Sequence, residues 1–463
     1  MLEAWQSIAR LFFPSRFKKS VLTTFRIAHY RPRAGHAVPA DAITGETTIT
    51  TPAKTGRGIA IDIGTTTIAA ASVEPGTGRI IASASMPNPQ ATWGADVLSR
   101  VAAIKRDPAL MPEMSRAVVA ACNETIETLL PTERACEISM AGNSVMEHIL
   151  LGVSPMVFAA PPFKPAFKKA ARLPCAQLGL TAATGATAYI FPLIGGFVGG
   201  DTTAVVLALG LHREEGNTLT LDIGTNSEIV LTANGRVYAA AAAAGPAFES
   251  GGIRDGMTAR PGAISGVRLT GDNVSLDVIG NATPAGICGS GLIEAVAALL
   301  KAGVIDRTGR IRGRAEIATN LGNRIVEGAD GNTFTLYKGA KRQISLTQQD
   351  VRSLQTAKAA IRAGVSMLLA KAGINANEVG KVWLAGAFGN NLNKDALSAV
   401  GLLTPEWLTI VNFAGDAALT GASMTIGSDD KKNEAESAAS MVKYVALSGS
   451  PRFEKEFLRE MNF

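Results

Sequence analysis

The fold of this chain is decided by the stretch Ile61-Asp62-Ile63-Gly64-Thr65-Thr66-Thr67. A near-copy, Leu221-Asp222-Ile223-Gly224-Thr225-Asn226-Ser227-Glu228, lies 160 positions further along. A strand-like run precedes each copy: Gly58 to Ile61 is apolar throughout, and Thr218 to Leu221 alternates with period two. Each Asp-Ile-Gly-Thr then predicts a sharp turn into a second strand. Two such hairpins facing each other would clamp the phosphates of a nucleotide.

The residue types in these two motifs suit that role. Glycine lets the backbone approach an anion without a side chain in the way, and turn amides add N–H donors. Asp62 and Asp222 would hold hydrated Mg²⁺, which prefers oxygen ligands and keeps several waters. One copy alone could be an ordinary tight hairpin turn, but two copies favour phosphate binding. We therefore expect the phosphate cradle to consist of Gly64, Thr65, Thr66, Gly224, Thr225 and Asn226.

Composition limits the classes of protein to which the chain can belong. Its 463 residues are enough for two or three domains, with 47% hydrophobic and 18% charged residues, as in well-folded proteins. A net charge of +6 is small for this length, so we expect no nucleic-acid partner.

The cysteines and the longest uncharged stretch bear on location. Four cysteines lie far apart without a C-x-x-C pair, which indicates free thiols in a cytoplasmic protein. No secretory signal is visible. Residues 183–200 are uncharged and about the length of a membrane span, but Pro192 and several glycines interrupt them. We expect no membrane crossing.

The first 56 residues differ from the rest of the chain. Trp5, Ile8 and Phe12 recur at helical spacing among many cationic residues, and residues 37–56 resemble a linker. The basic helix could dock on a partner or a membrane surface. We favour the alternative, a helix that packs on its own domain with a solvated basic face.

The remaining chain gives one pattern of strands, hairpins and helices twice. The duplication predicts two α/β lobes, each with a mixed sheet covered by helices on both faces. We expect a basic helix and linker at 1–56, a first lobe at 57–204, a second lobe at 205–425 and C-terminal helices at 426–463.

A strand that ends in small residues occurs late in the second lobe, at Val382 to Gly389. Small residues allow a purine or ribose to contact backbone, although an ordinary strand-to-helix turn looks the same. We expect Gly386, Ala387, Phe388 and Gly389 to line a nucleoside pocket.

The order of these features resembles the superfamily of acetate kinase, sugar kinases, Hsp70 and actin (ASKHA). The resemblance implies duplicated actin-like, ribonuclease H-like lobes with ATP and Mg²⁺ between them. It places the connecting helix near Asp201, which would orient the attacking water or only cap that helix. Glu228 could touch the metal shell or pair on its hairpin, and Asp416 could reach the cleft or cap a helix.

From about residue 57 onward the chain more narrowly resembles the ATP-dependent reductive activators of corrinoid proteins. This resemblance is carried by Asn88-Pro89-Gln90, Gly94-Ala95-Asp96-Val97, Gly142-Asn143-Ser144, Gly245-Pro246-Ala247-Phe248-Glu249, Gly286-Ile287-Cys288-Gly289-Ser290-Gly291-Leu292, residues 354–364 and Ala385 to Asn390. It implies an ATPase that promotes return of Co(II) to Co(I) in a corrinoid protein or cobalamin-dependent methyltransferase. A small-molecule kinase and a non-catalytic, ATP-gated scaffold are the alternatives.

One departure from that family concerns cysteine. Its members usually carry an iron–sulfur domain, but no clustered cysteines occur here, so we expect no cluster in this chain. A separate ferredoxin or flavoprotein would then supply electrons. A less favoured alternative is a homodimer that shares a cluster through Cys122 and Cys136. Cys288, among glycines, could be redox-active, but a small residue at a tight helix start is favoured.

Overall fold

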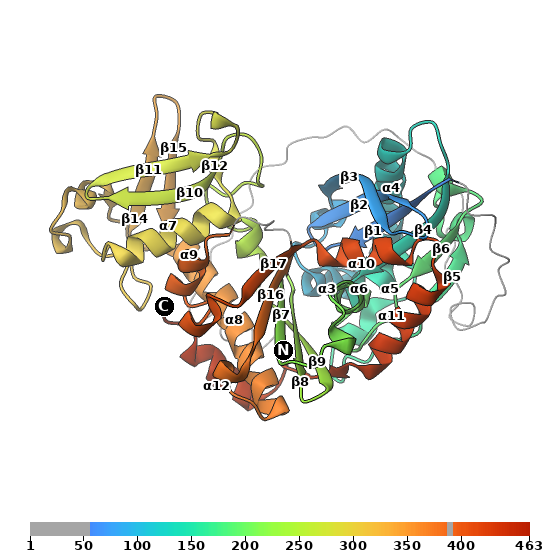
Figure 1. The fold of residues 1–463 in the computed structure, drawn as a ribbon. Coiled ribbons are helices and arrows are strands. Elements are labelled where there is room, and N and C mark those ends of the chain that lie inside the picture. The colour runs from blue at the N-terminus through green and yellow to red at the C-terminus, as the bar shows by residue number, and fades with distance from the viewer. Residues whose placement is uncertain (1–55, 387–391) are drawn as a thin grey trace.

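The computed structural model describes residues 56–386 and 392–463, which form two α/β lobes with a smaller subdomain on the second (Figure 1). Each lobe is built on a six-stranded sheet. The strands run in the order β3-β2-β1-β4-β6-β5 in one sheet and β17-β16-β7-β8-β9-β18 in the other.

The first lobe begins with an antiparallel meander that continues into parallel strands. β1 (Arg57–Ile63) pairs with β2 (Thr67–Glu74), and β2 pairs with β3 (Arg79–Pro87). β4 (Ala135–Gly142) lies parallel to β1 on its other side. The remaining elements are β5 (Ala171–Pro174), β6 (Thr187–Ile190), α3 (Val97–Arg106), α4 (Leu110–Leu129) and α5 (Ser144–Leu150).

The second lobe repeats this connectivity. β7, β8 and β9 form the meander, and β16 lies parallel to β7 as β4 does to β1. The duplication and the fold class predicted from the sequence are confirmed. The elements are β7 (Thr218–Ile223), β8 (Ser227–Ala233), β9 (Arg236–Ala242), β16 (Lys381–Gly386), β17 (Val411–Gly415), β18 (Lys443–Tyr444), α8 (Gln348–Ala372), α9 (Lys394–Ala399) and α12 (Pro451–Arg459).

The first strand of the second lobe is buried on both sides, as expected for a sheet with helices on both faces. The alternation in Thr218–Leu221 is typical of a strand with one solvated face, yet all four residues are buried. Helices cover both faces of this sheet, so Thr218 and Thr220 lie inside it. The residues from Gly286 onward predict a helix, but Gly286 and Ile287 form a short strand and the helix begins at Gly289.

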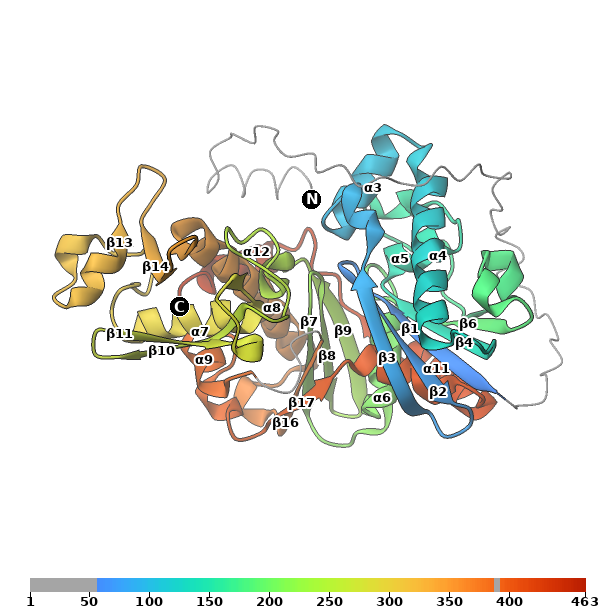
Figure 2. The same cartoon turned by 90° about the horizontal axis from the view of Figure 1, so that it is seen from above.

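Helices late in the chain return to the first lobe. α10 (Ala417–Thr425) and α11 (Asp429–Met441) lie beside the first lobe in both views (Figures 1 and 2). Leu419, Ala422 and Ile426 pack with Ala60 of β1 and with Ala204 of α6 (Gly200–Ala208). The C-terminal part of the chain therefore ties the two lobes together.

A subdomain between β9 and α8 was not expected from the sequence. It holds two three-stranded sheets and α7 (Gly289–Lys301). The strands are β10 (Ala263–Thr270), β11 (Asn273–Val278), β12 (Gly286–Ile287), β13 (Ile325–Val326), β14 (Thr333–Lys338) and β15 (Gln343–Thr347).

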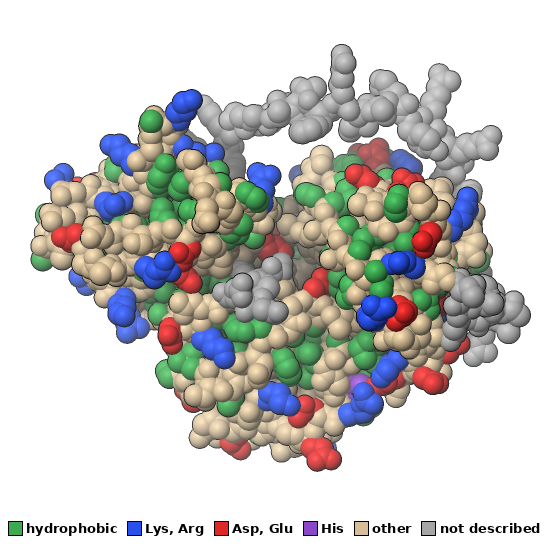
Figure 3. All heavy atoms as spheres, turned by 45° about the horizontal axis from the view of Figure 1, so that its top comes forward, with side chains coloured by type: hydrophobic (Ala, Val, Ile, Leu, Met, Phe, Trp, Pro, Cys, Tyr) green, Lys and Arg blue, Asp and Glu red, His purple; other side chains and the backbone are tan. Residues whose placement is uncertain are grey.

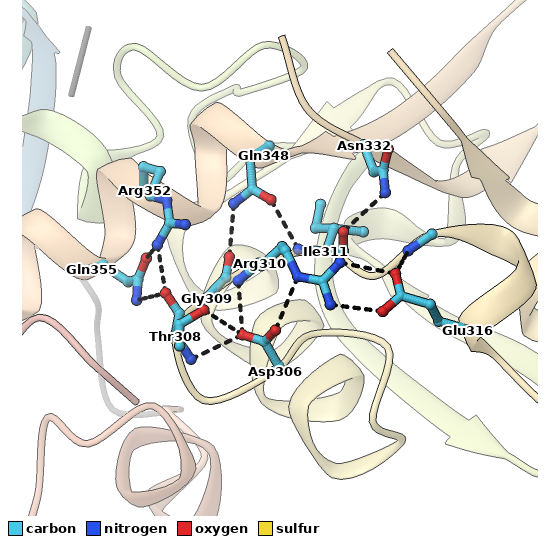
Figure 4. A network of polar contacts seen from close by, with 11 residues as sticks. Asp306, Thr308, Gly309, Arg310, Ile311, Glu316, Asn332, Gln348, Arg352 and Gln355 are labelled. Carbon is cyan, nitrogen blue, oxygen red and sulfur yellow. Dashed lines mark hydrogen bonds and ion pairs between the residues drawn. The ribbon is translucent and has the colours of Figure 1, made fainter. Parts of the chain in front are cut away.

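A polar network fixes the loop after α7 to the first turns of α8 (Figure 4). Gln348 donates to the carbonyl of Gly309 (2.7 Å) and accepts from the amide of Ile311 (2.8 Å). Within the loop, Arg310 pairs with Asp306 and Glu316. Because these bonds satisfy the loop's backbone groups, the loop holds a defined position on α8. Within the described ranges, no helix is both long and apolar enough to cross a bilayer.

Candidate functional site

The turn between β1 and β2 is the first of the two predicted phosphate hairpins. Gly64 starts it, and a Cβ there would lie 2.5 Å from the carbonyl oxygen of Thr67, so only glycine fits. The Thr65 side chain is 7% exposed, and its hydroxyl accepts a hydrogen bond from Asn143 at 3.0 Å. Asn143 also caps α5, which fixes the hairpin to that helix.

The turn between β7 and β8 is the second hairpin, and it meets the first directly. Asn226 donates to the Thr65 hydroxyl at 3.2 Å. The hydroxyl oxygens of Thr66 and Thr225 lie 2.7 Å apart across the cleft. The structure therefore brings together all six residues predicted to form the phosphate cradle: Gly64, Thr65, Thr66, Gly224, Thr225 and Asn226.

Six carboxylates line the cleft around these turns. Figure 3 shows a hollow between the halves of the molecule, with acidic side chains at its base. The cleft holds about 720 Å³ not filled by protein atoms, part of it open to solvent. Among the described residues that line it there is no lysine or arginine, so no cationic side chain offsets the acidic groups Asp62, Asp201, Asp222, Glu228, Glu249 and Asp416.

This crowding changes the acidity of the group. Burial raises the pKa of Asp222 to about 8, with further contributions from Asp416, Asp201 and Glu249. Burial raises the pKa of Asp201 to about 6. The pKa values of Asp62 and Glu228 also rise, first through burial and then through neighbouring carboxylates. A cation in the cleft would relieve this repulsion.

Two of the carboxylates stand at helix starts. Asp201 is in the first turn of α6 and accepts from the amide of Thr202 at 2.6 Å, while the N-cap position belongs to Gly199. Asp416 caps α10 by accepting from the amide of Leu419 at 2.8 Å, and it also lines the cleft. For Asp416 the two roles considered from the sequence are therefore compatible.

Glu228 lies on β8 directly opposite Asp222 in the strand register. Its side chain is 7% exposed, and its Oε1 atom has no hydrogen-bond partner among the described residues. Buried polar atoms are nearly always hydrogen-bonded, and a water bound to a cation would supply the hydrogen bond that this oxygen lacks.

Comparison with known proteins assigns the chain to a family. Two family models match it: "RACo middle region" over residues 57–214 and "C-terminal domain of RACo the ASKHA domain" over residues 216–463. The chain belongs to the RACo family. It is 32% identical, over 88% of its length and 70% of the other protein, to the "Corrinoid activation enzyme RamQ" of Eubacterium limosum.

Two further similarities agree with this assignment. The "[Co(II) methylated amine-specific corrinoid protein] reductase" of Methanosarcina barkeri is 24% identical over 59% of this chain and 51% of that protein. A solved structure titled "Reductive activator for corrinoid,iron-sulfur protein" has a TM-score of 0.82 and 34% identity, covering 89% of this chain and 67% of its own.

In this RACo-family chain, a shell behind the first hairpin was not recognised from the sequence. Arg100 is fully buried on α3 and donates to the backbone carbonyl of Thr65 and to the side chain of Gln90 (3.0 Å). Asn88 donates to the carbonyl of Gly64 at 2.9 Å. The segments 88–90 and 94–97, noted only for their resemblance, thus border a support for the phosphate turn.

Glu249 is a second cleft residue that sequence reasoning did not assign. It ends a short 3-10 helix after β9 and accepts hydrogen bonds from the hydroxyls of Thr66 (2.9 Å) and Thr225. The available signal was the segment Gly245 to Glu249, which was noted without a role. Glu249 and its partner Thr66 are 183 positions apart in the sequence, so local sequence patterns could not predict this hydrogen bond.

The cysteines are free in this member of the RACo family. Burial raises the pKa of the Cys122 thiol to about 12, and Cys136 is half-buried. Cys288 is 3% exposed at the N-cap of α7, and its thiol donates a hydrogen bond to the carbonyl of Ile264. In the described ranges no group of three or more His, Cys, Asp or Glu residues is arranged to hold a metal ion.

The predicted nucleoside pocket is described only at its edge. Gly386 ends β16 and lines the cleft, where a Cβ would lie 2.4 Å from the carbonyl of Ile223 and the φ angle is +104°. Ala387, Phe388 and Gly389 lie outside the described residues, as do residues 1–55 of the basic helix and linker predicted at 1–56.

Proposed function

We propose that this protein uses ATP to drive the reductive activation of a corrinoid protein or cobalamin-dependent methyltransferase from Co(II) to Co(I). The acidic cleft between two duplicated hairpins, in a chain of the RACo family, carries the proposal. Its relatives bear the names of corrinoid activators.

The cleft residues fit a magnesium nucleotide. Asp62 and Asp222 would hold the metal through its water shell, and the unpartnered Oε1 of Glu228 offers a further acceptor for those waters. Magnesium would neutralise both the carboxylates and the phosphates. The hydroxyls of Thr65, Thr66 and Thr225 would donate to phosphate oxygens, and Gly386 would border the nucleoside.

Asp201 is the residue we propose to orient the attacking water. It lies in the cleft, and its pKa near 6 leaves it largely ionised at neutral pH. Hydrolysis would alter the contact between the two lobes, which meet at the hairpins. A corrinoid protein bound across the lobes would sense that change, while a separate ferredoxin or flavoprotein supplies one electron to Co(II).

The test is an anaerobic reactivation assay. The purified chain is mixed with a Co(II) corrinoid protein, Mg²⁺, ATP and a low-potential ferredoxin or flavodoxin, and the visible spectrum is followed. We expect the Co(I) spectrum to appear with ATP and not with a non-hydrolysable analogue. Equal reduction with and without ATP, across several corrinoid partners, would contradict the proposal.

A matched pair of variants separates cleft chemistry from folding. Asp222→Asn should abolish turnover and keep cooperative unfolding, while Asp395→Asn, an exposed site on α9, should leave turnover unchanged. Wild-type turnover in Asp222→Asn would remove that carboxylate from the mechanism.

A further inference from the structure

Glu249 places a carboxylate between the two hairpins, at the point where they touch. One of its oxygens accepts from the hydroxyl of Thr66 on the first lobe and from that of Thr225 on the second. Its other oxygen faces the turn at Gly224, 3.7 Å from where a Cβ would stand. An anion therefore already occupies the meeting point of the two lobes.

The protons available at this point are few. Thr66 and Thr225 carry one hydroxyl proton each, yet three close contacts join the two threonines and Glu249. Only two of the three contacts can be hydrogen bonds at once. When both protons point to the carboxylate, neither hydroxyl has a proton left for a phosphate oxygen.

The segment that carries Glu249 is joined to the second hairpin. The amide of Gly245, at the start of the segment, donates to the carbonyl of Thr225 at 2.9 Å. The contact of this segment with Thr66 on the first lobe, in contrast, is made by the side chain of Glu249 and not by its backbone. Rotation of that one side chain would free the Thr66 hydroxyl from Glu249, while the segment keeps its backbone bond to the second hairpin.

We infer that Glu249 stands in for the terminal phosphate of the nucleotide. Any phosphoryl group that contacts both hairpins must take the two threonine hydroxyls from this carboxylate. Glu249 then weakens the binding of ligands whose outermost phosphate reaches the junction, and it leaves ligands that stop short of the junction unaffected. This inference rests on the proposed nucleotide site and assigns it a residue that lowers its affinity for ATP relative to ADP.

The experiment measures binding of a non-hydrolysable ATP analogue and of ADP, each with Mg²⁺, by calorimetry on the full chain. Glu249→Gln keeps the shape but removes the charge that strengthens these hydrogen bonds and repels phosphate. We expect the analogue to bind about tenfold tighter to this variant and ADP to bind nearly as before. Glu74→Gln, an exposed carboxylate on β2, is the matched control and should change neither affinity.

A second variant keeps the inference testable if Glu249→Gln fails to fold. Glu249→Asp keeps the charge on a shorter side chain that cannot reach both hydroxyls, and the same shift toward the analogue is expected. Unchanged or weaker analogue binding, or an equal gain for ADP, would overturn the inference. Absence of any nucleotide binding by wild type would instead reject the proposed function.

Discussion

Asp222 shows how the cleft sets the charge of a single residue. Its pKa is about 8 in the folded chain, against about 3.9 for an aspartate in an unfolded one. The folded protein thus holds a proton that the unfolded chain releases at low pH. The stabilisation from this proton is complete below about pH 4 and is lost as pH rises through about 8.

We therefore predict that the nucleotide-free protein loses thermal stability between pH 5 and pH 9. Asp222→Asn removes the ionisable group, so its unfolding temperature should fall less over that interval. Calorimetric melts at matched ionic strength measure both proteins, with Asp395→Asn as the exposed control. Parallel curves for wild type and Asp222→Asn would show that folding does not raise the pKa of this carboxylate.

Arg100 supports the first hairpin from behind, and its loss should be felt in both stability and binding. Burial lowers its pKa only to about 10, so it remains charged at neutral pH. Arg100→Met leaves the carbonyls of Thr65 and Gly94 without their donor, which should cost about 2–4 kcal/mol of unfolding free energy.

Urea unfolding of Arg100→Met measures this cost, and nucleotide titration measures the accompanying loss of affinity. Arg106→Met, an exposed position at the end of the same helix, is the control and should change neither quantity. A stable Arg100→Met with unaltered affinity would mean that the turn holds its shape without this support.

At the scale of elements, the contact between α6 and α10 leaves no room for a larger residue. A Cβ on Gly421 of α10 would lie 2.0 Å from the carbonyl oxygen of Ala204 on α6. Asp201 lies in the first turn of α6, and Asp416 caps the start of α10. The close packing thus sets the spacing of two cleft residues.

We predict that Gly421→Ala destabilises the protein by about 1–3 kcal/mol, because the helices must separate to admit the methyl group. Turnover should fall as well, since Asp201 moves with α6. Thermal melts and ATPase rates check both effects. Thr420→Ala, the exposed neighbour, should retain the turnover of wild type. Unchanged stability in Gly421→Ala would imply that α10 packs further from α6.

Local patterns sufficed for the hairpins and failed for what is assembled from distant segments. The hairpin turns at Asp62-Ile63-Gly64 and Asp222-Ile223-Gly224 could be predicted because a tight turn depends on consecutive residues. The return of α10 to the first lobe and the subdomain between β9 and α8 depend on tertiary packing. Glu249 escaped notice because its partner Thr66 is 183 positions away.

At the scale of the whole molecule, the cleft is shared by the lobes, so a ligand that fills it should stabilise both together. The expected gain is about 2.7 kcal/mol at a ligand concentration one hundred times the dissociation constant. A single cooperative transition that moves upward with Mg²⁺–ATP would show this in calorimetry. Two separate transitions, only one of which responds, would indicate that the nucleotide contacts one lobe alone.

The most direct test of the account is a titration of ATP into the 463-residue chain with and without Mg²⁺. We predict one binding site per chain in the presence of Mg²⁺, much weaker binding without it, and a similar loss in Asp62→Asn and Asp222→Asn. Binding that is absent in wild type, or that persists unchanged in both Asp62→Asn and Asp222→Asn, would contradict a magnesium nucleotide held between the two hairpins.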